Sequence, residues 1–212
     1  MGWVEIVGFV TGALCVWLAG RQHVANFAVG IANNLVFLVL FASQGIYANA
    51  GLQVVYVVLA ALGWYWWRRP RVPDERAGRR ELAVSRTPRL VWPVAAAAAA
   101  VLALALVALL SLTDASVQPW WDATTTALSL VAQVMLGRKW LGSWAVWIVT
   151  DVLLVGLYAS VGLWLTSALY VLFIGLCVHA WRGWAGEARE RAAPGTSARD
   201  GAAQRDGTRV GA

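Results

Sequence analysis

The stretch "SWAVWIVTD" (residues 143–151) places a carboxylate within an apolar run typical of a membrane interior. Trp144, Trp147 and Asp151 stand at positions i, i+3 and i+7, so they share one face of a helix. A carboxylate above two indole rings is a good pocket for a flat, positively charged ring, since charge attraction and cation–π contact act together. An aromatic belt at the membrane interface is the alternative interpretation of the two tryptophans.

More polar side chains occur at comparable depth in other apolar runs. They are Asn33 and Asn34 in "GIANNLVF", Gln53 and Tyr56 in "LQVVY", and Tyr158 two turns beyond Asp151. Each one alone is explained equally well by an interhelical hydrogen bond worth about 0.6 kcal/mol. Together they form a polar ring at a depth where lipid would tolerate none, and with Trp144, Trp147 and Asp151 they predict a substrate-binding site.

The elements that position these residues are apolar segments long enough to cross a bilayer. Only 13% of the residues are charged and 60% are hydrophobic, whereas a soluble domain carries about 25% charged residues. Helices are expected because lipid offers no hydrogen-bond partner to the backbone. The seven expected transmembrane helices cover residues 3–20, 25–42, 47–67, 90–112, 121–137, 142–160 and 164–184. The predicted fold is therefore an all-α integral membrane protein.

Basic residues are confined to segments that fall on one side of seven such helices. The segment 68–89 contains eight arginines, and the turns at Arg21 and at Arg138–Lys139 are also basic. Because cytoplasmic loops are rich in Lys and Arg, this pattern predicts an outer N-terminus and a cytoplasmic C-terminus in a plasma (inner) membrane. The tail, residues 185–212, is polar and rich in Gly, Ala and Arg, so we expect it to be disordered.

An internal repeat appears when the sequence is displaced by 117 positions. Residues 3–67 then align with 120–184 without a gap, and 15 of the 65 aligned positions are identical. Asn34 aligns with Asp151, and Trp64 and Trp67 align with Trp181 and Trp184. The expected domains are a first three-helix repeat (1–67), a cytoplasmic basic loop (68–89), a linking helix (90–112) and a second repeat (120–184). Such a 3+1+3 plan makes the two repeats parallel, as in transporters that bind substrate at the repeat interface.

The absence of catalytic motifs limits the function classes. The sequence has no GxxxxGK[ST] phosphate loop, HExxH motif or nucleophile elbow, and His23 and His179 lack metal-ligand spacing. We therefore expect no enzyme activity, cofactor or metal. A non-transporting scaffold or receptor stays open as the rival class, in which Asn34, Gln53 and Asp151 would pair directly and leave no cavity.

Two motifs resemble those of the PnuC family of nicotinamide riboside transporters. The stretch "YVVLAALGWYWW" (56–67) matches the family pattern YxxxxxxGWxxW, and "WAVWIVTD" (144–151) is similar to WxxWxxxN. "GIYANAGLQVVY" (45–56) resembles the family segment that precedes the first motif. The resemblance covers residues 3–184 and implies a vitamin-precursor facilitator, a SWEET-like arrangement of helices and a homo-oligomer. It also implies that Trp144 and Trp147 contact the nicotinamide-like ring and that Gln53 joins the site.

One position departs from the family pattern, because Asp151 stands where the family has Asn. An amide donates and accepts hydrogen bonds, whereas a carboxylate only accepts and adds charge. Nicotinamide riboside is a cation and suits this acid, as does thiamine, so thiamine or a nucleoside is the alternative substrate. With no nucleotide site expected, net uptake would depend on a cytosolic kinase that traps the product.

The remaining tryptophans near the basic segments have an expected role of their own. Trp64, Trp66, Trp67, Trp181 and Trp184 cluster beside arginines. Tryptophans in such places commonly anchor a helix at the membrane interface. We therefore expect these five residues to face the lipid headgroups.

Overall fold

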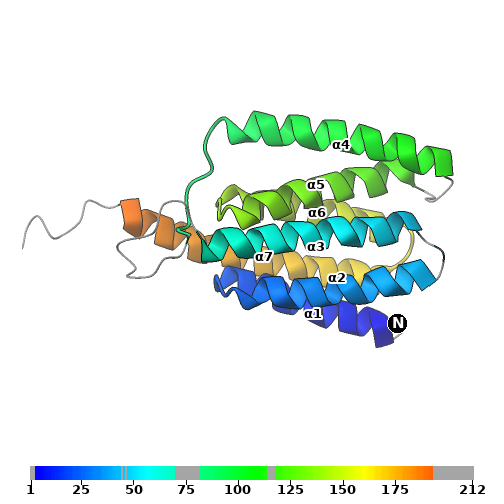
Figure 1. The fold of residues 1–212 in the computed structure, drawn as a ribbon, viewed down its shortest axis with the longest axis horizontal. Helices are drawn as coiled ribbons and strands as arrows, with labels where there is room; N and C mark the ends of the chain where they lie inside the picture. Colours follow the sequence, from blue (N-terminus) through cyan, green and yellow to red (C-terminus); the bar gives the residue numbers. More distant parts are fainter. Residues whose placement is uncertain (1–2, 44, 46, 70–81, 114–117, 193–212) are drawn as a thin grey trace, which may run out of the picture.

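Seven α-helices make up the computed structural model, which describes residues 3–43, 45, 47–69, 82–113 and 118–192 (Figure 1). Their bounds are α1 Trp3–Gly20, α2 Ala25–Ser43, α3 Tyr47–Arg68, α4 Val91–Thr113, α5 Pro119–Gly137, α6 Gly142–Ser160 and α7 Trp164–Ala192. The all-helical prediction is confirmed, and the starts and ends agree with the expected spans to within two residues, except at the end of α7.

Five helices, α2, α3, α4, α6 and α7, are long and apolar enough to cross a membrane. Their outward side chains are apolar too: Val94 on α4, for example, is 60% exposed. In water such a surface would be unfavourable, whereas lipid tails solvate it and every helical backbone group is paired internally. The described chain therefore has the surface of a multi-pass membrane protein.

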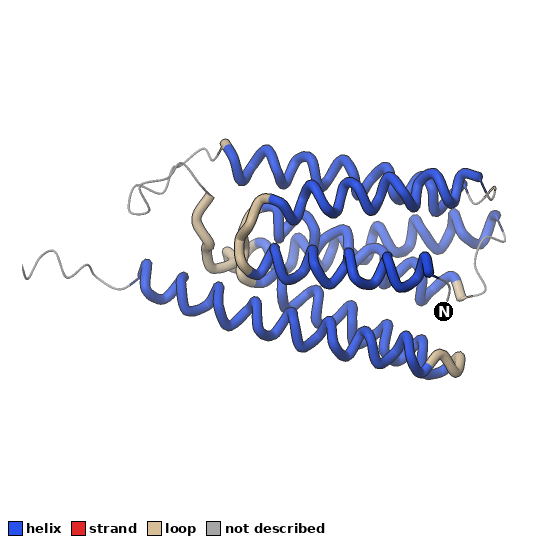
Figure 2. Tube along the Cα trace, turned by 90° about the horizontal axis from the view of Figure 1, so that it is seen from below, coloured by secondary structure: helices blue, strands red, loops and turns tan. Residues whose placement is uncertain are grey.

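The helices pack as two similar sets (Figures 1 and 2). In the first set α1 contacts α2 and α2 contacts α3, and in the second set α5 contacts α6 and α6 contacts α7. The sets meet where α1 packs on α7 and α3 packs on α5, whereas α4 packs on α5 at the edge of the bundle. Each of these contacts, except that of α4, has a counterpart 117 residues along the chain.

Backbone conformations also recur at that spacing. Gln22 and Lys139 both adopt positive φ values, 54° and 52°, and Gly45 and Gly162 adopt 75° and 77°. Positive φ is uncommon for residues other than glycine, so its recurrence at equivalent positions is informative. The turn between the first two helices of each set is therefore built in the same way, as is the turn that precedes the third.

Small residues let the two sets approach closely. A Cβ atom added to Gly20 would lie 2.9 Å from the Cβ atom of Ala180, where α1 meets α7. At the equivalent place, a Cβ atom on Gly137 would lie 3.3 Å from the Cα atom of Gly63, where α5 meets α3. These contacts fix the distance between the sets at the end of the bundle where α1 and α5 end.

A strap, residues 82–90, holds the start of α6. Ser85 forms a parallel β-bridge with Trp140, its N–H donates to the Lys139 carbonyl (3.1 Å), and its own carbonyl accepts from the N–H of Leu141 (3.0 Å). The Thr87 hydroxyl accepts from the N–H of Gly142 at 2.7 Å, which satisfies one of the first donors of α6. The helix that carries Trp144, Trp147 and Asp151 is thus held at its first turn.

Two expectations are wrong in detail. Helix α7 continues to Ala192 instead of ending near residue 184, so the expected tail begins as helix, while residues 193–212 lie outside the described part. Trp67 and Trp184 do not face the lipid headgroups, since they are only 1% and 0% exposed and lie in the hydrophobic core. Residues 70–81 of the expected basic loop also lie outside the described part.

Candidate binding site

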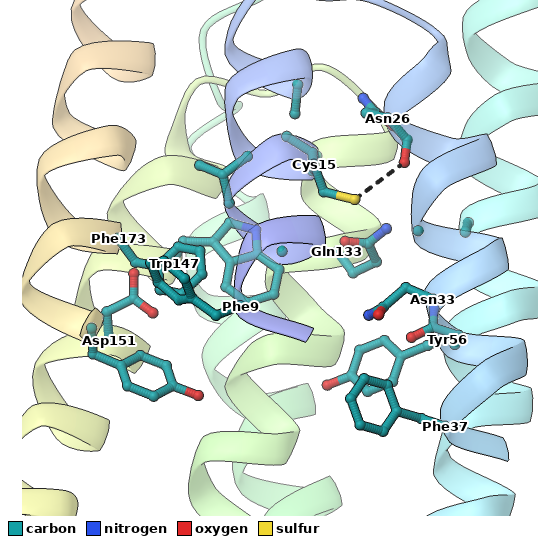
Figure 3. A pocket seen from close by; sticks show the side chains of 18 of the residues that line it. Phe9, Cys15, Asn26, Asn33, Phe37, Tyr56, Gln133, Trp147, Asp151 and Phe173 are labelled. Carbon is teal, nitrogen blue, oxygen red and sulfur yellow. Dashed lines mark hydrogen bonds between the residues drawn. The ribbon is translucent and has the colours of Figure 1, made fainter. Parts of the chain in front are cut away.

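A cavity of about 860 Å³ lies between the two sets of helices, lined by residues of α1, α2, α3, α5, α6 and α7 (Figure 3). Its volume falls within the range of pockets that hold small organic molecules, about 300–1,000 Å³. All eight residues expected in a substrate site line it: Asn33, Asn34, Gln53, Tyr56, Trp144, Trp147, Asp151 and Tyr158. The structure therefore brings together every polar side chain of the expected ring.

One side of the cavity, the acidic wall, consists of Trp147, Asp151 and Phe173 (Figure 3). Asp151 is only 6% exposed, and its Oδ2 atom lies 3.8 Å from the Sγ atom of Cys177. Trp144 lines the same cavity and is 1% exposed. The i, i+3, i+7 spacing on α6 thus places the two indoles and the carboxylate on one cavity-facing surface.

The opposite side, the amide wall, contains Asn33, Asn34, Gln53 and Tyr56 from α2 and α3, and Asn33 and Tyr56 are labelled in Figure 3. The Thr11 hydroxyl lies 2.9 Å from Oδ1 of Asn33, which orients that amide. The two walls differ chemically, since one offers aromatic faces and a carboxylate and the other offers amide donors and acceptors. The cavity is therefore suited to a ligand with a flat charged end and a polar end.

Tyr158 stands near the far end of α6 and stacks on Tyr170 of α7, with ring centroids 5.3 Å apart. Tyr170 in turn packs against Phe173 at 5.8 Å, and Phe173 lies edge-on to Phe9 at 5.3 Å. These aromatic residues line the cavity as well. Tyr158 therefore belongs to an aromatic row that extends the acidic wall.

Several lining residues were missed by the sequence analysis. Phe9 and Phe173 carry no polar signal, and aromatic residues in apolar runs are more often part of a packed core. Gln133 could have been found, because it is an amide in the middle of an apolar run, as Gln53 is. Cys177 is an ordinary buried thiol by sequence, and only the fold brings it to Asp151.

A closing layer of four aromatic residues, Phe27, Trp67, Trp144 and Trp184, blocks one end of the cavity. Phe27 packs edge-on against Trp67 with centroids 4.9 Å apart, and Trp144 packs edge-on against Trp184 at 5.2 Å. Trp67 and Trp184 meet each other at 6.3 Å. All four side chains are at most 2% exposed, so the layer is tightly packed at this end.

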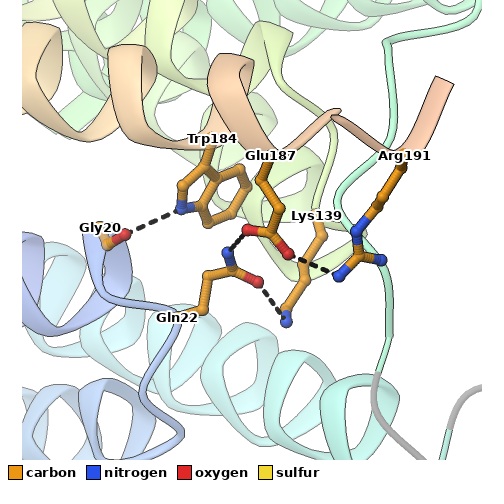
Figure 4. A network of polar contacts seen from close by, with 6 residues as sticks. All are labelled: Gly20, Gln22, Lys139, Trp184, Glu187 and Arg191. Atoms are coloured by element: carbon orange, nitrogen blue, oxygen red, sulfur yellow. Dashed lines mark hydrogen bonds and ion pairs between the residues drawn. The ribbon is translucent and has the colours of Figure 1, made fainter. Parts of the chain in front are cut away.

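Polar contacts reinforce the closing layer (Figure 4). The Lys139 ammonium donates to Oε1 of Gln22 at 2.9 Å and lies 4.4 Å from the ring centre of Trp67. The Gln22 amide donates to Glu187, which is also paired with Arg191. The Trp184 indole N–H donates to the Gly20 carbonyl at 3.1 Å. Charge, cation–π contact and hydrogen bonds thus join both sets of helices at this end.

The opposite end of the cavity reaches the surface of the bundle. Phe41 near the end of α2 and Leu163 in the turn before α7 both line the cavity, and Leu163 is 50% exposed. This end is the one at which α1 begins. The cavity therefore extends from a closed end beside Lys139 toward an open end beside Leu163.

The site shows no sign of metal chemistry in the residues that the structure describes. No group of three or more His, Cys, Asp or Glu side chains is placed to hold a metal ion there. Of the described residues that line the cavity, Asp151 is the only one with a formal charge. The arrangement is suited to binding.

A bundle of apolar helices around a polar-lined cavity that is closed at one end defines a membrane transporter for a small organic molecule. The chain belongs to the nicotinamide mononucleotide transporter family, whose family model matches residues 2–186. The expected relationship to PnuC proteins is therefore confirmed. Membership of a transporter family also excludes an enzyme, as expected from the sequence, and it excludes the rival class of non-transporting scaffold or receptor.

Known relatives extend this result. The chain is 28% identical to the nicotinamide riboside transporter PnuC of Escherichia coli strain K12, over 90% of this chain and 88% of the relative. It is 27% identical to the riboflavin/roseoflavin transporter RibM of Streptomyces davaonensis, over 86% and 84% of the two chains. The crystal structure of the vitamin B3 transporter PnuC superimposes with a TM-score of 0.68 at 25% identity, covering 89% of this chain and 83% of the other.

Proposed function

We propose that this chain carries nicotinamide riboside across the inner membrane and so supplies NAD synthesis. The observation that carries the proposal is the acidic wall, where Asp151 and Trp147 line one cavity of suitable volume. Nicotinamide riboside has a flat pyridinium ring with a fixed positive charge and a polar ribose. The relative named above as a nicotinamide riboside transporter and the structure named as a vitamin B3 transporter support the same assignment.

The two walls suggest how the ligand is held. The pyridinium stacks on Trp147 with its charge balanced by Asp151, because cation–π and ionic attraction add in a site shielded from water. Trp144 is 1% exposed and packs against Trp184 at the closed end, so its ring forms the floor beneath Trp147. Asn33, Asn34, Gln53, Tyr56 and Tyr158 supply donors and acceptors for the ribose hydroxyls and the carboxamide.

The proposed architecture is two parallel three-helix repeats joined by a linking helix, in the 3+1+3, SWEET-like arrangement. Matched helix contacts, matched positive φ values and matched close approaches at a spacing of 117 residues support it. In this scheme all seven helices cross the membrane. The repeats cover 1–67 and 120–184, 90–112 links them, and 68–89 and 185–212 are the cytoplasmic loop and tail.

The proposed orientation places the closing layer at the cytoplasmic side. The basic residues Arg21, Arg138 and Lys139 lie at that end, as does the start of the arginine-rich segment 68–89, and cytoplasmic ends attract such residues. With the N-terminus outside, the cavity then faces outward. In this orientation the described conformation would receive substrate from outside the cell.

Transport is proposed to be facilitated by alternate exposure of the cavity, without nucleotide hydrolysis. A functional link to a cytosolic kinase follows, since phosphorylation of the product would keep the free ligand concentration low inside. A homo-oligomer is proposed on resemblance alone. Movement of the closing layer is the step that would release the ligand.

Thiamine is the second candidate, and Asp151 is the observation that favours it. Thiamine combines a cationic thiazolium with an aminopyrimidine that donates hydrogen bonds, and a carboxylate accepts both charge and donors. Riboflavin, named for one relative, is uncharged and gains nothing from a carboxylate. The site chemistry therefore ranks the two cations above the flavin.

The test is uptake into proteoliposomes that contain the purified full chain. Labelled nicotinamide riboside, thiamine, riboflavin and uridine are offered separately, and protein-free liposomes from the same lipid serve as the control. We expect accelerated entry of nicotinamide riboside, with thiamine next. If none of the four enters faster than in protein-free liposomes, the proposal is wrong.

A further inference from the structure

Among the described residues that line the cavity, Asp151 is the only one with a formal charge, and none of the others compensates it. The residue is 6% exposed, and among the described residues the Cys177 thiol lies beside it, with Sγ 3.8 Å from Oδ2. No Lys, Arg or His of the described ranges lines the cavity. A carboxylate at such depth is costly unless a cation or a proton neutralises it.

The helices packed against α6 offer no cation to this carboxylate. From α7 the titratable groups that face it are Cys177 and Tyr170, and along α6 itself the next is Tyr158. Helix α5 carries one acidic residue, Asp122, in its first turn. Across the cavity, Cys15 of α1 and Tyr56 of α3 are the titratable lining groups. All of these groups are neutral or acidic.

The basic residues on and beside α6 and α7 lie away from the cavity. Lys139 is held by Gln22 and the ring of Trp67 beyond the closing layer. His179 and Arg182 on α7 are exposed, and neither lines the cavity. In the part of the chain that the structure describes, no cation is thus placed to neutralise Asp151 when the cavity is empty, and a proton can do so.

We propose that Asp151 exchanges a proton for the cationic substrate, so that each positively charged ligand carried inward is balanced by one proton carried outward. This inference rests on the proposed function, in which the ligand is a cation. On the outer side the cation binds the carboxylate and the carboxyl proton passes to the outer water. On the inner side the cation leaves, and a proton from the inner water binds the carboxylate before the empty cavity returns.

The charge balance of this cycle has two measurable consequences. The cavity is neutral in both directions of movement, so a membrane potential does no net work on the cycle. A pH gradient does drive it: acid inside and alkali outside favour uptake, because binding releases a proton outside and return needs one inside. At one proton per cation, each unit of pH difference supports about a tenfold concentration ratio of the ligand.

The experiment measures labelled nicotinamide riboside uptake in proteoliposomes of the full chain under two separate gradients. In one arm the interior is one pH unit more acidic, while valinomycin and equal potassium hold the potential at zero. In the other arm valinomycin and unequal potassium impose a negative interior at equal pH. For the natural chain we expect about tenfold accumulation in the first arm and none beyond equilibration in the second.

Asp151→Asn is the matched variant, because the amide has nearly the same shape and cannot exchange a proton near neutral pH. Each protein is compared only with itself across the arms, so a change in rate does not affect the interpretation. We expect the variant to ignore the pH gradient and to accumulate the cation under the negative potential. Two outcomes would overturn the proposed exchange. In one, the natural chain accumulates the ligand under the potential and does not respond to pH. In the other, Asp151→Asn accumulates the ligand under the pH gradient.

A binding measurement on the natural chain provides a second decision if the variant does not fold. Calorimetry of nicotinamide riboside binding in detergent, in buffers of different protonation enthalpy, reports how many protons leave on binding. We expect release that approaches one proton per ligand as the pH falls, and no release at any pH contradicts the exchange. If the natural chain binds and carries no nicotinamide riboside at all, the proposed function is wrong and this inference fails with it.

Discussion

Replacing Gly63 with alanine tests the tight packing behind the closing layer. A Cβ atom at Gly63 would lie 2.5 Å from Cε1 and 2.9 Å from Cζ of Phe27. The Phe27 ring has little room to retreat, because it packs edge-on against Trp67, which is itself 1% exposed. On another side, Gly63 approaches Gly137 of α5. Gly63→Ala must therefore displace a side chain that lines the cavity.

The magnitude follows from two opposed effects. Overpacking of this kind costs about 1–3 kcal/mol, whereas alanine in a helix returns up to about 1 kcal/mol relative to glycine. Gly175→Ala on α7 is the matched control, because a Cβ atom there meets nothing within 4 Å. The control keeps the propensity gain without the clash, so the two variants should differ by about 1–3 kcal/mol.

Thermal unfolding of the full chain in one detergent measures this difference. For a chain of this size, 1 kcal/mol corresponds to about 2–4 °C, so Gly63→Ala should unfold roughly 2–12 °C below Gly175→Ala. Equal unfolding temperatures would show that Phe27 can move freely. The closing layer could then not be the rigid barrier described above.

Three further predictions concern the site and its closed end. Trp147→Ala should weaken nicotinamide riboside binding by about 0.5–2 kcal/mol, or roughly 2- to 30-fold by calorimetry, and Trp164→Ala, on a 71% exposed residue, should not. Asp151→Asn should lower nicotinamide riboside affinity less than thiamine affinity, since an amide can pair with the carboxamide, while thiamine affinity falls roughly 10- to 100-fold; unchanged affinities with lower stability would make the acid structural. Lys139→Met removes the charged hydrogen bond to Gln22, worth about 1.5–3 kcal/mol, so hydrogen exchange in residues 20–24 should quicken, and unchanged exchange would refute that role.

Helix positions were predictable because each apolar run ends in a turn with a clear signal. The end of α7 was not predictable in the same way, since the polar stretch "AGEARERA" (185–192) looks like the start of a tail. It is nevertheless rich in good helix formers, and Glu187 and Arg191 are paired one turn apart. Trp67 and Trp184 were misassigned for another reason. A tryptophan beside arginines has the same local sequence whether it faces lipid or a second set of helices, and only the packing distinguishes the two.

The polar ring could be predicted because lipid makes a buried polar residue conspicuous, and all eight expected residues do line one cavity. The apolar residues that complete the cavity could not be predicted, because Phe9 and Phe173 differ from ordinary core residues only in what they face. The proximity of Cys177 to Asp151 depends on how α6 and α7 are rotated against each other. That rotation follows from side-chain packing along both helices and not from a local pattern.

The aligned positions 117 residues apart explain how similar sets of helices produce two different walls. Phe27 and Trp144 occupy equivalent places in the closing layer, and both remain aromatic because the same barrier is needed from each set. Within the cavity the pairs diverge: Gly30 corresponds to Trp147, and Asn34 corresponds to Asp151. A symmetric cavity would bind nicotinamide riboside equally in two orientations, whereas these two changes put the ring and the charge on one side only. We infer that divergence at these two pairs fixes the orientation of the substrate, and that it places the single exchangeable proton on the same side as the positive charge it balances.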